Sequence, residues 1–296
     1  MLILHDPRCA EYGSSLRPEQ PARVVGTAAH LKQAHPEWLW RVPKGEVEDS
    51  TLLLAHTPDH LERLQKPVDF DPDTPYLPGV EVHARRAAGS AIEALLHAQE
   101  HRTPVFSLMR PPGHHATASE AMGFCYLNSV AVAALYASRV MGLRRVAVWD
   151  FDAHHGNGTE FILHSQQAPE TFFFASVHQY PGYPGTGNQD HGPNIRNWPV
   201  APRTPRATHR AALRASLDAV MSFSPDVILV SAGFDAYVDD PITSMTLERE
   251  DFAILGEWIA GTNRPTAAIL EGGYSDQLPL LVDAFLSAWE NASRTA

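Results

Sequence analysis

Short apolar runs alternate with longer amphipathic segments along most of this chain. The runs are rich in β-branched and aromatic residues, which is typical of buried strands. We predict strands over Leu2–His5, Val105–Leu108, Val146–Phe151, Phe172–Val177, Val227–Ser231 and Ala267–Leu270. Apolar residues at three- and four-residue spacing predict helices over Val82–Gln99, Ser129–Met141, Arg206–Phe223, Leu247–Ala260 and Gln277–Glu290. This alternation predicts an α/β fold, with a central parallel sheet and helices on both faces.

Three longer segments have no regular pattern and predict loops. They are Pro67–Gly79, Pro111–Gly123 and Gln179–Pro205, the last of which contains six prolines. Long loops in a compact domain are usually functional, so we expect these to form the walls of a pocket. No linker or internal repeat divides the chain, and we therefore expect a single domain over residues 1–296.

Polar residues cluster directly after four of the predicted strands. The clusters are Arg110–His115 (RPPGHH), Asp150–Gly158 (DFDAHHGNG), Ser231–Asp235 (SAGFD) and Leu270–Tyr274 (LEGGY). Open α/β sheets bind their ligands beyond the carboxyl ends of the strands, so we expect the four clusters to converge. Within the second cluster, Asp152 and His154 lie two residues apart. Along an extended chain they point to the same side, as two ligands of one metal ion would.

Composition narrows the classes of partner and compartment. The chain has 23 basic and 34 acidic residues and a formal net charge of −11, which argues against nucleic acid or an anionic membrane as a partner and favours cationic ligands. Two cysteines, Cys9 and Cys125, predict no disulfide framework, so we expect a cytoplasmic protein. Met1–Pro7 does not resemble a signal peptide, and we find no apolar run long enough to span a membrane. Nothing in the sequence indicates an oligomeric state.

Seven motifs, in the same order along the chain, resemble the zinc-dependent histone deacetylase family. They are the tandem-histidine turn at Arg110–His115, Gly123–Asn128, Asp150–Gly158, Ser176–His178, Pro184–Gly187, Ala232–Asp235 and Glu271–Tyr274. The resemblance runs from about Arg17 to about Tyr274. Asn157 and Ala232–Asp235 resemble class II and bacterial deacetylase-like amidohydrolases more than class I enzymes. The resemblance implies the arginase/deacetylase fold.

A metal ligand set follows from these residues. Two aspartates and one histidine leave an open position on a zinc ion, which a hydrolytic metal needs in order to polarise the acyl oxygen and to lower the pKa of the attacking water. We assign Asp152, His154 and Asp235 as ligands of one catalytic Zn²⁺ per chain, with Fe²⁺ as the alternative ion. The resemblance also implies a structural K⁺ or Na⁺ near Asp150 and Asp152.

The remaining catalytic roles follow from the resemblance. His115 is expected to act as general base and then general acid, beside His114 as an electrostatic partner. Asp150 is expected to orient His114, and Asn157 to orient His115. Because Asn157 is neutral where class I members have a carboxylate, we expect His115 to hold a proton less strongly. Tyr274 is expected to donate a hydrogen bond to the oxyanion, with Gly272 and Gly273 giving the segment freedom to move.

Substrate contacts are expected from residues in the predicted loops. Phe124 should line one wall of a narrow apolar channel, with the Gly123 carbonyl near the scissile nitrogen, Ile242 further along and Tyr183 as the candidate for the opposite wall. Asp73 lies where relatives have a rim carboxylate that holds the substrate backbone. Two arginines belong to the expected exit region. Arg23 matches an internal family arginine near a product exit, and Arg17 replaces the usual family histidine.

We interpret the chain as a metal-dependent amidohydrolase that removes acetyl or other acyl groups from lysine side chains or related primary amines. An acetylpolyamine amidohydrolase is the alternative within the family. We favour acyl-lysine or a small acylated amine, because we identify neither an extra rim carboxylate nor a constricting insertion.

Two other classes fit the residues less well. A binuclear manganese ureohydrolase resembling arginase needs further carboxylates, but Gly156 and Gly233 stand in those regions. A non-catalytic binding protein on the same fold would be expected to have lost His115, Tyr274 or a metal ligand, and none is lost.

Overall fold

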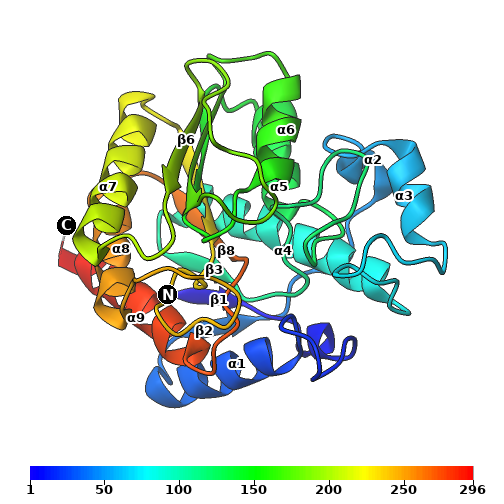
Figure 1. The fold of residues 1–296 in the computed structure, drawn as a ribbon, viewed down its shortest axis with the longest axis horizontal. Coiled ribbons are helices and arrows are strands. Elements are labelled where there is room, and N and C mark those ends of the chain that lie inside the picture. The colour runs from blue at the N-terminus through cyan, green and yellow to red at the C-terminus, as the bar shows by residue number, and fades with distance from the viewer. Residues whose placement is uncertain (296) are drawn as a thin grey trace.

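The chain folds around one parallel sheet in the computed structural model, which describes residues 1–295. The strands are β1 (Leu2–Leu4), β2 (Leu39–Arg41), β3 (Val105–Ser107), β4 (Val146–Asp150), β5 (Phe172–Gln179), β6 (Ile195–Val200), β7 (Val227–Ala232) and β8 (Thr266–Leu270). Their order across the sheet is β2-β1-β3-β8-β7-β4-β5-β6, and every pair is parallel (Figure 1). The predicted α/β class is confirmed. Ala296, which the single-domain prediction included, lies outside the described residues.

Helices cover both faces of the sheet, and each face has its own hydrophobic core. One core joins the sheet to α1 (Ala22–Ala34), α7 (Arg206–Ser222), α8 (Arg249–Gly261) and α9 (Leu278–Thr295). The other joins it to α2 (Asp49–Leu52), α3 (Pro58–Leu64), α4 (Val80–His101), α5 (Ser129–Arg139) and α6 (Asn157–Ser165). In β4, Ala147 and Trp149 face the first core, whereas Val146 and Val148 face the second. This alternation explains why the four residues before Asp150 are all apolar.

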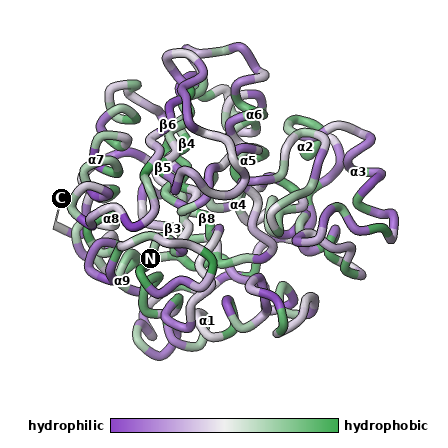
Figure 2. Tube along the Cα trace, viewed as in Figure 1, coloured by the Kyte–Doolittle hydropathy of each residue, from purple (hydrophilic) through white to green (hydrophobic). Residues whose placement is uncertain are grey.

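Hydropathy along the chain matches this layered arrangement. Figure 2 shows hydrophobic residues on the central strands and hydrophilic residues in outer segments such as the region of α3. Among the helices of the described chain, none is both long and apolar enough to cross a membrane.

The two edge strands are the main elements that the sequence pattern missed. The prediction of an uninterrupted loop over Gln179–Pro205 is wrong, because Ile195–Val200 form β6. Pro199 within β6 is compatible with an edge strand, where one side of the backbone needs no ladder partner. β2 at the other edge has only three residues, of which Leu39 is 66 % exposed. Helices α1, α2, α3 and α6 and a short 3₁₀ helix, η1 (Pro7–Ala10), were not predicted either.

The strand order brings the four polar clusters to neighbouring strand ends. In sequence the strands that precede them are the third, fourth, seventh and eighth, but in the sheet β3, β8, β7 and β4 lie side by side. Arg110–His115 follows β3, Leu270–Tyr274 ends β8, Ser231–Asp235 ends β7 and Asp150–Gly158 ends β4. The predicted convergence at the carboxyl edge is confirmed.

Candidate active site

Asp152, His154 and Asp235 bring three potential ligand atoms together. The atoms lie within 4.8 Å of one another, and this is the one such group of three in the described residues. His154 Nδ1 lies 3.1 Å from Asp152 Oδ1 and 2.9 Å from Asp235 Oδ2. Burial alone would lower the pKa of His154, yet the carboxylates of Asp235 and Asp152 raise it well above its ordinary value. The point where the three residues meet therefore favours positive charge.

Backbone groups from neighbouring strand ends orient both carboxylates. The Gly272 N–H donates to Asp152 Oδ2 over 2.8 Å, and the Ala153 N–H donates to Asp235 Oδ1 over 2.8 Å. A Cβ atom at Gly233 would collide with the Asp152 carboxylate, and one at Gly272 would collide with both carboxylates. Glycine at these two positions therefore leaves room for the carboxylates of Asp152 and Asp235. Two carboxylates and one imidazole form a donor set that zinc accepts, so the residues present fit a zinc ion.

His114 lies beside this group and is held by carboxylates. Its Nδ1 donates to Asp150 Oδ2 over 3.0 Å, and its backbone N–H donates to Glu271 Oε2 over 3.1 Å. Burial would lower the pKa of His114, but the charges of Asp152 and Asp150 raise it to about 10. The His114 ring is therefore expected to be doubly protonated, and so positively charged, at neutral pH.

His115 has the opposite electrostatic character. Burial and the neighbouring His114 and His154 rings lower its pKa well below the ordinary value. Its Nδ1 lies 2.7 Å from Asn157 Oδ1, while Asn157 Nδ2 donates to the His115 carbonyl and to Met122 Sδ, each over 3.4 Å. Those two contacts orient the amide so that its oxygen faces the ring. Nδ1 therefore carries the proton of the neutral ring, and Nε2 can accept another.

Tyr274 is positioned through its backbone and its ring. Its N–H donates to Asp240 Oδ2 over 2.8 Å. Arg23 Nε donates to the Gly273 carbonyl over 2.7 Å, Arg23 Nη2 donates to the Glu271 carbonyl, and the guanidinium lies 4.7 Å from the centre of the Tyr274 ring. The Tyr274 hydroxyl has no hydrogen-bond partner among the described residues. It is therefore free to bind a ligand.

Two buried carboxyl groups support the site without having been singled out from the sequence. Burial raises the pKa of Glu271 to about 7, and its Oε2 also accepts from the Gly113 N–H over 2.6 Å. Burial, followed by the nearby Asp235, raises the pKa of Asp240 to about 7. Glu271 belongs to the LEGGY motif, which gave a signal for it. Asp240 follows Asp235 by five residues with no motif of its own.

A cavity of about 260 Å³ leads from the surface to these groups. It is lined by Arg17, Pro18, Asp73, His115, Gly123, Phe124, His154, Tyr183, Ile242 and Tyr274. All five predicted substrate contacts are in this set. His115 lies at the buried end, whereas Asp73, Tyr183 and Ile242 are exposed at the mouth. Arg17, which sequence reasoning associated with the exit region, also lines this cavity.

Two aromatic residues, Phe124 and Tyr183, line the cavity. Phe124 has a φ of +68°, which is uncommon for an aromatic residue, and its N–H donates to Thr74 Oγ1 over 3.1 Å. The Tyr183 ring meets the His115 ring edge-on at a centroid distance of 5.1 Å. A Cβ at Gly123 would press on the rings of His115 and Tyr183. Gly123 therefore keeps the space beside these two rings open.

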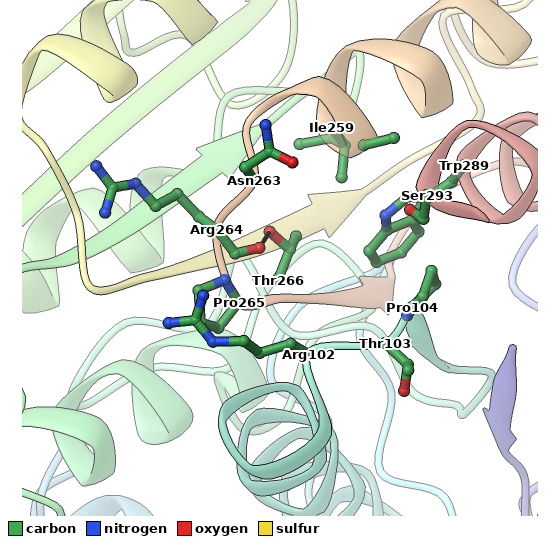
Figure 3. A pocket seen from close by; sticks show the side chains of 11 residues that line it. Arg102, Thr103, Pro104, Ile259, Asn263, Arg264, Pro265, Thr266, Trp289 and Ser293 are labelled. Atoms are coloured by element: carbon green, nitrogen blue, oxygen red, sulfur yellow. Dashed lines mark hydrogen bonds between the residues drawn. The ribbon is translucent and has the colours of Figure 1, made fainter. Parts of the chain in front are cut away.

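A second cavity, also of about 260 Å³, lies at the amino ends of β3 and β8, the opposite ends of these strands from the first cavity (Figure 3). Pro104 and Pro265, which directly precede β3 and β8, line it together with Arg102, Arg264 and Trp289. It contains none of the metal-ligand candidates and no carboxylate. None of the histidine, aspartate or tyrosine side chains described above lines it.

The fold and the residues around the first cavity define a class of protein, namely metal-dependent hydrolases of the deacetylase type. Residues 17–288 match the family described as "Histone deacetylase domain". A probable deacetylase from Methanothermobacter thermautotrophicus is 34 % identical over 94 % of this chain and 86 % of its own. Acetylpolyamine amidohydrolase 1 from Pseudomonas aeruginosa is 34 % identical over 76 % of this chain and 67 % of its own.

A solved structure gives the same result. That of the acetylpolyamine aminohydrolase from Burkholderia pseudomallei superposes with a TM-score of 0.84 at 26 % identity, covering 99 % of both chains. The chain belongs to the histone deacetylase family. It is a deacetylase or amidohydrolase that acts on amides, as the resemblance of its motifs implied.

Proposed function

We propose that this protein is a mononuclear zinc amidohydrolase that removes acyl groups from lysine side chains or closely related primary amines. The observation that carries the proposal is the meeting of one metal-ligand group, a neutral histidine and an unpartnered phenol at the inner end of one narrow cavity. A linear acyl-amine reaching down this cavity would bring its amide to all three.

Asp152, His154 and Asp235 would hold the zinc ion. When bound, zinc supplies a Lewis acid that polarises the amide carbonyl and lowers the pKa of water. The family is zinc-dependent, and the glycine-lined positions of both carboxylates support this assignment. Fe²⁺ remains the alternative for the same ligands, and a structural K⁺ or Na⁺ near Asp150 and Asp152 belongs to the proposal as well.

His115 would move the proton. Its Nε2 is the unprotonated nitrogen of a neutral ring, so it can take a proton from the attacking water and return it to the leaving amine. Asn157 holds the ring in that tautomer through Nδ1. A neutral amide stabilises the protonated ring less than a carboxylate would, which favours release of the proton to the amine.

His114 would keep its own proton and contribute charge. Its contact with Asp150 and its raised pKa support a fixed positive ring beside the reacting groups. That charge also disfavours a second lasting proton on His115. The pair therefore divides its roles, with His114 as the electrostatic partner and His115 as the base.

Tyr274 would stabilise the oxyanion with its phenol. Burial raises the pKa of Tyr274 well above the ordinary value, so the hydroxyl keeps its proton and can donate it in a hydrogen bond. Phe124 and Tyr183 would flank the methylene chain of the amine, with the Gly123 carbonyl near the scissile nitrogen. Ile242 and Asp73 would contact the substrate further out, at the mouth.

An acetylpolyamine is the second candidate substrate. Relatives in Pseudomonas aeruginosa and the structural neighbour from Burkholderia pseudomallei are named for that activity. An acetylpolyamine has the same linear acyl-amine end as acyl-lysine, so the inner end of the cavity does not separate the two. Discrimination between acyl-lysine and acetylpolyamine therefore depends on the groups at the mouth of the cavity.

Turnover by metal-defined protein tests the proposal. The panel contains acetyl-lysine peptides, longer acyl-lysines and acetylpolyamines, and the release of free amine is measured. We expect hydrolysis of acyl-lysine with one equivalent of Zn²⁺ or Fe²⁺ per chain. Two equivalents of tightly bound Mn²⁺ with urea formed from a guanidino substrate would overturn it, as would an absence of amide hydrolysis across the panel.

A further inference from the structure

The mouth of the active-site cavity carries one charge of each sign. Apart from histidines and tyrosines, Arg17 and Asp73 are the only ionisable side chains among its lining residues. They come from two separate segments, before α1 and between α3 and α4. Asp73 is exposed and Arg17 is half-buried, whereas His115 at the other end is buried. Both charges therefore face the part of a substrate that stays outside the aromatic passage.

Arg17 is held in place but is not neutralised. Its Nη1 donates to the Pro72 carbonyl over 3.2 Å, which fixes it beside the segment that carries Asp73. No carboxylate forms an ion pair with it in the described chain, in contrast to the nearby Arg23 and Arg110, which both pair with Glu19. A guanidinium has five N–H donors, so most of those on Arg17 are available to a ligand.

Asp73 is equally open. Its backbone N–H donates to Asp71 Oδ1 over 2.8 Å, which shapes the turn, but its own carboxylate has no partner among the described residues. In the part of the chain that the structure describes, Arg17 and Asp73 do not form an ion pair with each other. The mouth thus offers a free cation and a free anion, and the hydrogen bond from Arg17 to the carbonyl of Pro72, which precedes Asp73, links their two segments.

The cavity is also small. Its volume of about 260 Å³ is below the usual range of roughly 300–1,000 Å³ for pockets that hold drug-sized ligands. A volume of this size suits one slender chain, whose end would meet the charged groups at the mouth. The chemistry of that end is what the mouth can distinguish.

We propose that the mouth selects acylated amines whose far end is an amino-acid head with a free carboxylate, an inference that rests on the amidohydrolase function proposed above. Arg17 binds the carboxylate, and Asp73 accepts a hydrogen bond from the α-nitrogen. The substrate class is Nε-acyl-lysine with a free α-carboxylate, either as the amino acid or as the last residue of a peptide. Acetylpolyamines lack the carboxylate and bring a further ammonium toward Arg17, so they are disfavoured.

Matched substrates isolate the carboxylate. Nε-acetyl-lysine and Nε-acetyl-lysinamide differ only in that group, and monoacetylcadaverine is the same chain with the carboxylate removed altogether. We expect kcat/KM for the acid to exceed that for the amide and for the cadaverine by at least tenfold. A short peptide that ends in acetyl-lysine, compared with its C-terminal amide, shows whether the free amino acid or a peptide end is the better source of the carboxylate.

Variants of Arg17 test whether this residue causes the preference for the acid over the amide. Arg17→Ala and Arg17→Gln should bring the acid-to-amide ratio close to one, mainly because kcat/KM for the acid falls. Arg17→Lys, which keeps the charge but not the planar fork, should retain part of the preference. Arg264→Ala is the matched control, because it removes the same charge from an unpaired arginine at the remote cavity of Figure 3. It should leave the ratio unchanged.

Binding separates this inference from the hydrolase proposal. Calorimetry on Tyr274→Phe protein, in which slow turnover leaves the ligand intact, should give the same acid-over-amide preference and the same loss with Arg17→Ala. A ratio below tenfold in the wild-type protein, or a ratio that Arg17→Ala leaves unchanged, overturns the role of Arg17. Absence of turnover together with an Arg17-dependent binding preference overturns hydrolysis and supports the carboxylate site.

Discussion

The guanidinium of Arg23 lies 4.7 Å from the centre of the Tyr274 ring, and the same group donates hydrogen bonds to the carbonyls of Gly273 and Glu271. Arg23 is buried and does not line the cavity. It therefore acts on the segment that carries the phenol and not on the substrate. Through these contacts a residue of α1 holds the segment that follows β8, 250 residues further along the chain at Gly273.

Replacing Arg23 should impair catalysis more than binding. We expect Arg23→Gln to lower kcat by about tenfold or more, because the Tyr274 segment loses two of its hydrogen bonds, with little change in KM. Arg23→Lys should recover part of the rate, since it keeps a cation and one donor. Steady-state kinetics with a check of metal content measures this. A rise in KM at unchanged kcat would contradict a positioning role.

Tyr274→Phe removes the phenol and keeps the ring. We expect kcat to fall by about 10²–10³, which is the usual cost of losing one oxyanion donor. Zinc content should be unchanged, because Tyr274 is not among the proposed ligands. Single-turnover kinetics and metal analysis on the same sample test both points. Wild-type turnover in the Phe variant would show that the oxyanion is stabilised elsewhere.

Asp235→Ala should abolish tight metal binding. Only two ligands of the group of three would remain, and two cannot hold the ion well. We expect the metal content after dialysis to fall from one equivalent per chain to close to none. Asp276→Ala is the control, because it removes an exposed carboxylate outside the cavity. Full occupancy in Asp235→Ala would mean that the ligand assignment is wrong.

Gly272→Ala tests the space around the carboxylates. The added methyl group would collide with both Asp152 and Asp235, so one of the carboxylates must move. We expect zinc affinity to weaken by at least tenfold, as measured by competition with a chelator. Gly261→Ala at the end of α8 is the matched control, since its methyl group would meet nothing within 4 Å. Equal affinities in the two variants would remove the steric argument.

We expect the buried His209 in α7 to make the stability of the protein depend on pH. Both ring nitrogens are buried without a partner, and burial lowers the pKa of His209 from 6.5 to about 4. Because the folded state resists protonation, stability falls as the pH drops below 6.5. At pH 5.5 the cost is about 1.4 kcal/mol and at pH 7.5 it is close to zero.

His209→Leu should remove that pH dependence. The gap in unfolding free energy between His209→Leu and the wild-type protein is expected to widen by about 1.4 kcal/mol between pH 7.5 and pH 5.5. Urea unfolding at the two pH values measures it. His164→Leu at an exposed histidine should show no such widening. A constant gap for His209→Leu would show that the folded protein accepts the proton without cost.

The sequence alone determined the layers and the chemistry of the site. The first four residues of β4, Val146–Trp149, are buried on both faces of the sheet, so they form an unbroken apolar run that the sequence shows clearly. The edge strands could not be predicted from the apolar pattern, because β2 is largely exposed and β6 contains Pro199. The candidate catalytic residues could also be predicted from the sequence. Glycines and paired histidines directly after a strand have few structural reasons to occur together.

Only the tertiary structure decided which of these residues meet, and what lies at the mouth. The neighbouring positions of β3, β8, β7 and β4 are a property of strand pairing, which local patterns do not encode. Arg17 has no motif that marks it as a cavity residue, and Asp240 none that ties it to Tyr274. Both reach the site through contacts between segments far apart in the chain. Such contacts are specified by the packing of the whole fold, since no local run of residues contains both partners.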